Sequence, residues 1–198
     1  MPVNQRARIH LLQAGGVVLA AAIMLTQPLF VGRAHELIEM TGVGLVIICI
    51  GGRLWSSLYI GSRKNRELVT TGPYSISRNP LYLFSTIGAA GIGLMFGSIA
   101  ATLGLGLLAY GIFVVTANKE ASHLQTIFGS RYDAYARRTP LFWPKPSLYR
   151  DTAEVEFAPK ALKRTFVDGL IFLAVFPAIE AIEHLQADGI LPILLRVF

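Results

Sequence analysis

The sequence has few charged residues and almost no cysteine. Charged side chains make up 15% of the 198 residues, whereas soluble domains average about 25%. Because 53% of the residues are hydrophobic and several long segments carry no charge, the deficit indicates an integral membrane protein. The single cysteine, Cys49, excludes a disulfide framework. It lies in an apolar segment, where a buried thiol stays protonated, so it is a poor candidate for a nucleophile.

Internal repeats and low-complexity linkers are also absent, which favours one domain over residues 1–198. Within it, residues 1–60 hold the first two membrane segments. Residues 61–145 hold a motif-bearing loop, a hairpin and a further helix with a second motif. Residues 146–198 form a C-terminal loop and a last hydrophobic segment.

Long uncharged runs predict the membrane-spanning helices, because about 20 apolar residues cross the hydrocarbon layer. The runs at 11–32 and 40–62 predict one helix each. The uncharged stretch 79–118 is long enough for a hairpin of two helices that turns near Gly97. A shorter and more polar run at 165–187 either crosses the membrane or lies at its interface. The predicted fold class is an all-α integral membrane protein with four to five transmembrane helices.

The first hydrophobic run has two interpretations. Arg6 and Arg8 precede the apolar residues, as in a cleaved signal peptide. The run is longer than the usual hydrophobic region of such peptides, and no clear cleavage site ends it. A retained membrane helix is therefore favoured.

Basic residues are scarce in two of the predicted connections. Only Arg33 lies between the first two spans, and the turn near Gly97 has none, although the net charge is +6. The positive-inside rule places the N-terminus, the 61–79 loop and the 118–164 segment in the cytoplasm. Charge spread along such membrane-flanking loops suits anionic headgroups and argues against nucleic-acid binding.

Residues 70–82, TTGPYSISRNPLY, interrupt the apolar sequence with turn-forming residues, hydroxyl groups and one arginine. Because the following hairpin returns the chain to the same membrane face, Arg78 and Glu120 are expected to lie close together. An acid at the membrane boundary is costly unless it has a partner or a function. Glu120 is therefore either half of a structural ion pair or part of a site.

Beyond Glu120, apolar and aromatic residues recur at helical spacing, which predicts an amphipathic juxtamembrane helix on the cytoplasmic side. Pro140 and Pro144 are expected to end this helix, and Phe142-Trp143 to anchor it at the interface. The periodic positions are Ala117, Ala121, Leu124, Phe128, Tyr132 and Tyr135.

These two segments resemble the paired signatures of the isoprenylcysteine carboxyl methyltransferase and phospholipid methyltransferase family. The first signature is G-P-Y-x-x-x-R-H-P-x-Y-x-G, which resembles LVTTGPYSISRNPLY at 68–82. The second is E-E-x-x-L-x-x-x-F-G-x-x-Y-x-x-Y-x-x-x-x-P, which resembles EASHLQTIFGSRYDAYARRTPLFWP at 120–144. The segments have the family's order and flank the hairpin in the same way, so the resemblance extends over roughly residues 50–145.

The resemblance implies a membrane enzyme that uses S-adenosylmethionine without the Rossmann-like fold of soluble methyltransferases. Its lipophilic or amphipathic acceptor would enter the cytoplasmic site from the bilayer, with an isoprenylcysteine-like carboxylate expected first and lipid amines or thiols next. Arg78 is then the implied catalytic residue, because an arginine suits an anionic acceptor. The implied cofactor-binding residues are Gly72, Tyr74, Asn79, Pro80, Tyr82, Glu120, Tyr132 and Tyr135.

Three positions depart from the family pattern. Asn79 replaces a histidine, which keeps a hydrogen-bonding group but removes a titratable base. Phe84 replaces a glycine and is expected to crowd the backbone, and Ala121 replaces the second acid of the E-E pair. These changes suggest a subgroup with its own acceptor. Two alternatives stay open: a sterol-reductase-like membrane enzyme that uses NADPH, and an inactive scaffold of the same fold.

The remaining polar residues are expected to be structural. Arg53 is expected to extend to the headgroups from the cytoplasmic end of the second span. Glu180, Glu183 and His184 share a helical face with metal-ligand spacing, but an interfacial polar face is favoured. His35 is judged to have no partner at ligand spacing, so no metal site is expected.

Overall fold

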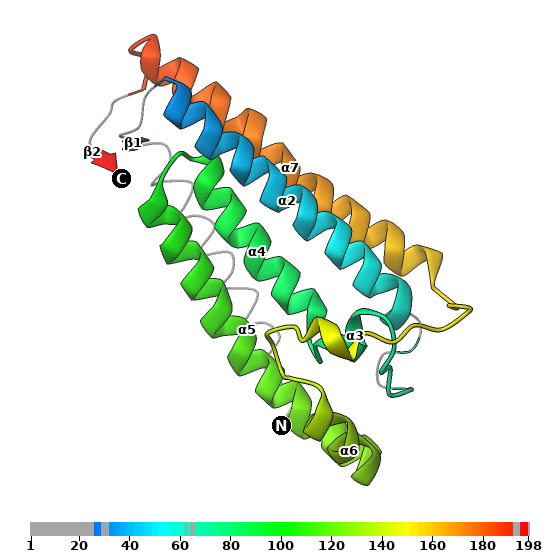
Figure 1. The fold of residues 1–198 in the computed structure, drawn as a ribbon. Coiled ribbons are helices and arrows are strands. Elements are labelled where there is room, and N and C mark those ends of the chain that lie inside the picture. The colour runs from blue at the N-terminus through cyan, green and yellow to red at the C-terminus, as the bar shows by residue number, and fades with distance from the viewer. Residues whose placement is uncertain (1–25, 29–31, 62, 64–65, 192–194, 198) are drawn as a thin grey trace.

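The computed structural model describes the chain in five stretches: residues 26–28, 32–61, 63, 66–191 and 195–197. Within them the chain forms six α-helices, one short 3₁₀ helix and one pair of short strands. The four longest helices lie side by side in the order α7, α2, α4, α5 (Figure 1). They are α2 (Arg33–Ile60), α4 (Pro80–Met95), α5 (Ile99–Phe128) and α7 (Pro159–Ala187).

The shorter elements gather at the two ends of this helical layer. At one end lie α3 (Pro73–Ile76), α6 (Ser130–Arg138) and the 3₁₀ helix η1 (Pro146–Leu148) (Figure 1). At the other end β1 (Thr26–Pro28) pairs in parallel with β2 (Leu195–Val197). This strand pair is a small correction to the all-α prediction; the rest of the described chain is helical or irregular.

The predicted membrane spans are confirmed in part. Among the described residues, α2, α5 and α7 are long and apolar enough to cross a membrane. The 16 residues of α4 extend about 24 Å, short of the roughly 30 Å hydrocarbon layer. The uncertain run at 165–187 belongs to α7, whose 29 residues suffice to cross. Most of the predicted span at 11–32 lies outside the described residues; within it, Thr26–Pro28 forms β1 and not a helix.

The predicted hairpin turn is confirmed between α4 and α5. Gly97 adopts a positive φ of 66°, a backbone conformation that glycine tolerates best. Ser98 then caps α5, since its side-chain oxygen accepts a hydrogen bond from the backbone N–H of Ala101 at 3.1 Å.

Glycines let α4 approach both neighbouring helices closely. A Cβ atom on Gly42 of α2 would lie 2.4 Å from the backbone nitrogen of Met95. A Cβ atom on Gly93 would lie equally close, 2.4 Å, to the backbone of Thr102 on α5. The small size of Gly93 is therefore required by this packing. Gly104, by contrast, has no atom within 4 Å of its Cβ position and faces outward.

The interior of the layer is apolar, and so is its outer surface. A buried cluster of Val46, Met95, Phe96 and Ile179 joins α2, the α4–α5 turn and α7. On α5, by contrast, large aliphatic side chains are exposed, as expected for a helix that contacts lipid. These exposed residues are Ile99, Leu103, Leu107, Leu108 and Val115.

Three local predictions need correction. The predicted juxtamembrane helix is split, because Gly129 takes a positive φ of 53° between α5 and α6. Phe142 is 4% exposed and so does not anchor at the interface, whereas Trp143 is 62% exposed. Arg53 does not extend outward as expected: its Nη1 donates a hydrogen bond to the Ser85 hydroxyl on α4.

Candidate functional site

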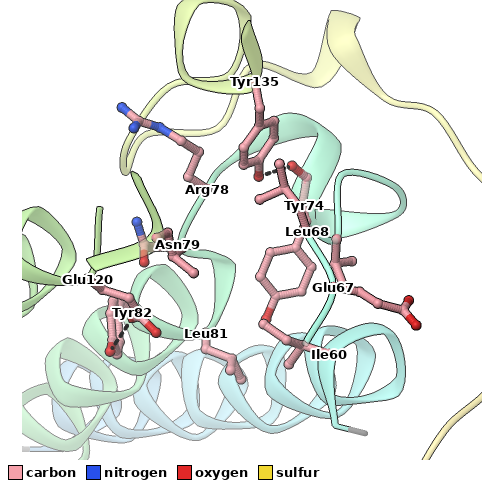
Figure 2. Close-up of a pocket in the computed structure, with 12 residues that line it drawn as sticks. Ile60, Glu67, Leu68, Tyr74, Arg78, Asn79, Leu81, Tyr82, Glu120 and Tyr135 are labelled. Atoms are coloured by element: carbon pink, nitrogen blue, oxygen red, sulfur yellow. Dashed lines mark hydrogen bonds between the residues drawn. The ribbon is translucent and has the colours of Figure 1, made fainter. Parts of the chain in front are cut away.

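A cavity lies at the end of the layer where α3 meets α4, α5 and α6 (Figure 2). Its volume is about 660 Å³ when space open to solvent is included. Both motif segments contribute to its walls. Of the predicted site residues, it is lined by Tyr74, Arg78, Asn79, Tyr82, Glu120 and Tyr135.

One wall of the cavity carries a carboxylate held by a tyrosine. The hydroxyl of Tyr82 on α4 donates to Glu120 Oε2 on α5 at 2.9 Å. The Tyr82 ring also stacks on Phe113, with ring centroids 5.1 Å apart and planes 12° apart. The α4–α5 hairpin therefore brings Tyr82 and Glu120 together, as Figure 2 shows.

Arg78 also lines the cavity. Its Nη1 donates to the hydroxyl of Tyr132 at 2.9 Å, and its Cζ lies 5.8 Å from the centre of that ring. Its Nε is buried and makes no hydrogen bond to any described residue. Tyr132 does not line the cavity, so its observed role is to hold Arg78 in place.

A buried tyrosine hydroxyl faces the cavity from α3. Tyr74 is 5% exposed, and its hydroxyl has no hydrogen-bond partner within the described stretches. The backbone oxygen of Tyr74 accepts a hydrogen bond from the Tyr135 hydroxyl at 2.6 Å. Burial raises the pKa of both tyrosines above the ordinary value, so both hydroxyls stay protonated at neutral pH. An unpaired buried hydroxyl is costly and marks a position where a ligand would be stabilised.

The hydroxyls and turn residues of the first motif have a structural role. They join it to the segment that follows α6. The side chain of Asn79 takes part, because its Nδ2 donates to the backbone oxygen of Leu141 at 2.9 Å. The other bonds are Gly72 N to Arg150 O at 2.7 Å, Arg78 N to Pro140 O at 2.9 Å, Lys145 N to Ile76 O at 2.9 Å and Ser77 Oγ to Phe142 O at 2.8 Å.

Two predicted site residues, Gly72 and Pro80, are buried but do not line the cavity. Gly72 has a positive φ of 58°, and a Cβ there would lie 2.3 Å from the ring of Tyr59. Pro80 begins α4, where its missing N–H costs nothing. Both residues shape the loop.

The crowding expected from Phe84 does not occur. Its ring occupies the space beside Gly52 on α2, where a Cβ would lie 2.2 Å from a ring carbon. The absence of a side chain at Gly52 therefore compensates for the larger residue on α4. The sequence contains both residues, but their pairing follows only from the packing of α2 against α4.

Sequence reasoning missed several cavity residues, most of them apolar. Leu68 and Val69 directly precede the first motif, so proximity in sequence was an available signal. Ile60 ends α2 and reaches the cavity only through helix packing. The residues missed are Ile60, Glu67, Leu68, Val69, Leu81 and Leu124.

A second polar cluster, at the opposite end of α2, was also missed. His35 Nε2 lies 3.1 Å from Glu39 Oε1 and 3.5 Å from Glu183 Oε2. The judgement that His35 has no partner was wrong, because Glu39 lies four residues later on the same helical face. Glu183 comes from α7 and could not be placed there from the sequence.

Comparisons with known proteins agree with the motifs. The family profile described as phospholipid methyltransferase matches residues 16–131, which is more than half of the chain. The cobalt-zinc-cadmium resistance protein CzcN of Cupriavidus metallidurans is 37% identical over 152 residues, covering 77% of this chain and 68% of that protein. The nickel-cobalt-cadmium resistance protein NccN of Alcaligenes xylosoxydans xylosoxydans is 37% identical over 154 residues, with 78% and 70% covered.

A eukaryotic enzyme is similar over a shorter region. The protein-S-isoprenylcysteine O-methyltransferase of Schizosaccharomyces pombe is 29% identical over 108 residues, covering 48% of this chain and 46% of that enzyme. No solved structure matches the chain. From the family profile, and from two relatives that are similar over most of their length, the chain belongs to the phospholipid methyltransferase family, a family of S-adenosylmethionine-dependent methyltransferases.

Proposed function

We propose that the chain is an integral membrane methyltransferase that binds S-adenosylmethionine in this cavity. One observation carries the proposal. Two motif segments on either side of the α4–α5 hairpin line the same cavity, and they contribute Arg78 and Glu120 to its lining.

The polar groups of the cavity suit the parts of this cofactor. Glu120 favours a cation, so it is the residue that would hold the ammonium group or ribose hydroxyls. The face of Tyr82 suits adenine or the cationic sulfonium. The buried hydroxyl of Tyr74, which finds no partner in the described structure, would bond the carboxylate or ribose.

When bound, the cofactor supplies an electrophilic methyl group attached to a positively charged sulfur. Its transfer needs an aligned acceptor more than a strong acid or base. Arg78 would orient an anionic acceptor, and the hydrogen bond to Tyr132 fixes the guanidinium before the acceptor arrives. A carboxylate acceptor is already deprotonated at neutral pH, so asparagine at position 79 is compatible with this reaction.

The apolar part of the cavity suits a lipophilic acceptor. Ile60, Leu81 and Leu124 line it from three different membrane helices, between which a hydrocarbon chain would enter from the bilayer. An isoprenylcysteine-like carboxylate is the first candidate, and lipid amines and thiols follow.

The cavity is proposed to face the cytoplasm. The 28 residues of α2 extend about 42 Å, comparable to a bilayer of about 40–45 Å with its headgroups. The two ends of α2 therefore lie at opposite membrane faces. Arg63, Arg66 and Arg131 lie near the cavity end, which the positive-inside rule assigns to the cytoplasm.

A role in metal resistance is a second proposal, favoured by the names of the two relatives that are 37% identical. It is compatible with the first if the methylated product is a membrane component needed under metal stress. The test is growth of a strain lacking the gene in cobalt, zinc or cadmium. Wild-type protein should restore growth and Arg78→Ala should not. Equal rescue by both would show that metal resistance does not require methyl transfer.

The decisive binding experiment compares two cofactors. Purified protein in detergent is titrated with S-adenosylhomocysteine and, separately, with NADPH, while the thermal midpoint is followed. A ligand that binds the folded state stabilises it by RT ln(1 + [L]/Kd). Saturable stabilisation by S-adenosylhomocysteine alone supports the methyltransferase. Stabilisation by NADPH alone would support a reductase, and no effect of either would support an inactive scaffold.

A further inference from the structure

We infer that His35, Glu39 and Glu183 form a binding site for a divalent transition-metal ion, at the opposite end of α2 from the cavity. His35 and Glu39 lie one turn apart at the start of α2, and Glu183 lies near the end of α7. One ligand atom from each residue lies within 4.8 Å of the other two.

Two of the three spacings between ligand atoms are close to those of a tetrahedral site. Bonds of about 2.0–2.2 Å to nitrogen and oxygen at tetrahedral angles place neighbouring ligand atoms about 3.3–3.6 Å apart. In the structure His35 Nε2 lies 3.1 Å from Glu39 Oε1 and 3.5 Å from Glu183 Oε2. The two glutamates each offer a ligand atom within 4.8 Å of the other, so an ion between the three residues needs side-chain adjustment at that pair.

The hydrogen bonding of the cluster is incomplete without a cation. The side chain of Glu39 is 9% exposed, and its Oε1, although close to His35, accepts no hydrogen bond from the described part of the chain. Glu183 Oε1 is likewise buried without a hydrogen-bond partner there. One N–H at Nε2 cannot satisfy two carboxylates. A metal ion bound to the Nε2 lone pair would contact both.

The donor set selects the class of metal. One imidazole nitrogen and two carboxylate oxygens suit Zn²⁺, Co²⁺ or Ni²⁺ better than Mg²⁺ or Ca²⁺, which prefer oxygen ligands alone. Glu36 and Glu180 add negative charge near Glu39 and so favour a cation. Three protein ligands leave a fourth position for water or a second molecule.

The proposed metal site is separate from the methyltransferase cavity. From His35 to Ile60, which lines the cavity, α2 rises about 38 Å. The metal site therefore lies at the other membrane face, where it would join α2 to α7. The inference does not depend on the proposed methyl transfer.

The test uses the whole protein in detergent after chelation of metal. Zn²⁺ is titrated by calorimetry, and Co²⁺ by the visible absorption that tetrahedral coordination makes intense. Wild-type protein should bind one equivalent. Because loss of even an outer-shell partner weakens metal binding about 10–100-fold, His35→Ala and Glu183→Gln should each weaken it by about 100-fold or more.

Matched controls come from neighbouring residues of the same type. His184→Ala removes an exposed histidine beside Glu183, and Glu36→Gln removes an exposed acid one turn before Glu39. His184→Ala should bind Zn²⁺ as wild type does, and Glu36→Gln, which removes only a nearby charge, should weaken binding far less than Glu183→Gln does. Circular dichroism and the metal-free thermal midpoint identify any variant that fails to fold. Glu183→Gln should disturb folding least, because the Glu183 side chain is 23% exposed.

The inference would be overturned by no saturable binding to wild-type protein, by unchanged affinity in folded His35→Ala and Glu183→Gln, or by equal losses in the controls. A cluster that only joins α2 to α7 by ion pairs would lower the thermal midpoint of these variants without any dependence on metal. That result would overturn it as well.

Discussion

The two ends of α2 carry polar groups that are assembled in different ways. At the cavity end, loops on either side of a hairpin are joined by backbone hydrogen bonds, such as Arg78 N to Pro140 O at 2.9 Å. At the other end, three side chains on two helices converge with no loop between them. The first arrangement is visible in the sequence as two long motifs. The second is visible only as a histidine and an acid four residues apart, with the other acid separated from them by most of the chain.

This difference explains which kinds of site can be recognised from a sequence alone. A loop that must turn, donate backbone hydrogen bonds and face a ligand constrains many consecutive residues, among them Gly72 with its positive φ. Two packed helices constrain only the residues that touch. The following variants test whether the two ends act independently, beginning with the largest expected effect.

Arg78→Ala should abolish most of the activity at the cavity end. Loss of a charge-bearing group that positions the reacting acceptor lowers turnover by about 10²–10³-fold. The measurement is transfer of labelled methyl groups to membrane lipids or to a prenylcysteine analogue. Arg131→Ala, an exposed arginine on α6, is the control. Equal activity in the two variants would remove Arg78 from the mechanism.

Glu120→Gln should weaken binding of S-adenosylhomocysteine by about 10–100-fold, since a hydrogen bond to a charged group contributes about 1.5–3 kcal/mol. Calorimetry gives the affinity, and Lys119→Gln on the exposed side of α5 is the control. The same variant should bind Zn²⁺ normally. A parallel loss of zinc binding would mean that the two ends are coupled or that the protein has unfolded.

Gly42→Ala tests the helix contact between the two ends. The new Cβ would lie 2.4 Å from the backbone of Met95, which cannot move without shifting α4. Overpacking of this kind costs about 1–3 kcal/mol, so the thermal midpoint should fall. Gly44→Ala is the control, because no atom lies within 4 Å of its Cβ position. An unchanged midpoint in Gly42→Ala would indicate looser packing of α2 on α4.

Tyr74→Phe should weaken S-adenosylhomocysteine binding by only a few-fold to about tenfold, as expected for one neutral hydrogen bond of about 0.5–1.5 kcal/mol. Stability of the free protein should not fall, because the hydroxyl has no partner in the described structure to lose. Tyr110→Phe, outside the cavity, is the control. Reduced stability with unchanged affinity would assign the hydroxyl a structural role.

The smallest expected effect is a pH dependence of the stability of the fold, caused by Asp151 at the cavity end of the molecule. Hydrogen bonds from Tyr59, Tyr149 and the backbone of Thr152 lower the pKa of its carboxyl below 3.8. A lowered pKa means that the contribution to stability is present above the ordinary pKa and is lost as the pH falls through the folded value. The thermal midpoint of the wild type should thus decline below about pH 4 more steeply than that of Asp151→Asn. Parallel curves would contradict this.

Much of the fold was predictable from the sequence, because the relevant signals are local. Apolar length predicted the helices that became α2, the α4–α5 hairpin and α7, and the Gly97 turn lies where expected. The break at Gly129 was missed because the hydrophobic period continues through it into α6. The two motifs identified the family and six of the residues that line the cavity.

The sequence by itself determined that the chain is a helical membrane protein of this family, since composition, run length and contiguous motifs are properties of the chain alone. Tertiary structure decided which helices touch. It paired Phe84 with Gly52, set Tyr59 against Gly72, and brought Glu183 to His35. The physical reason is that contacts between distant segments depend on how whole helices pack, and apolar helices of similar length offer many arrangements that local patterns do not distinguish.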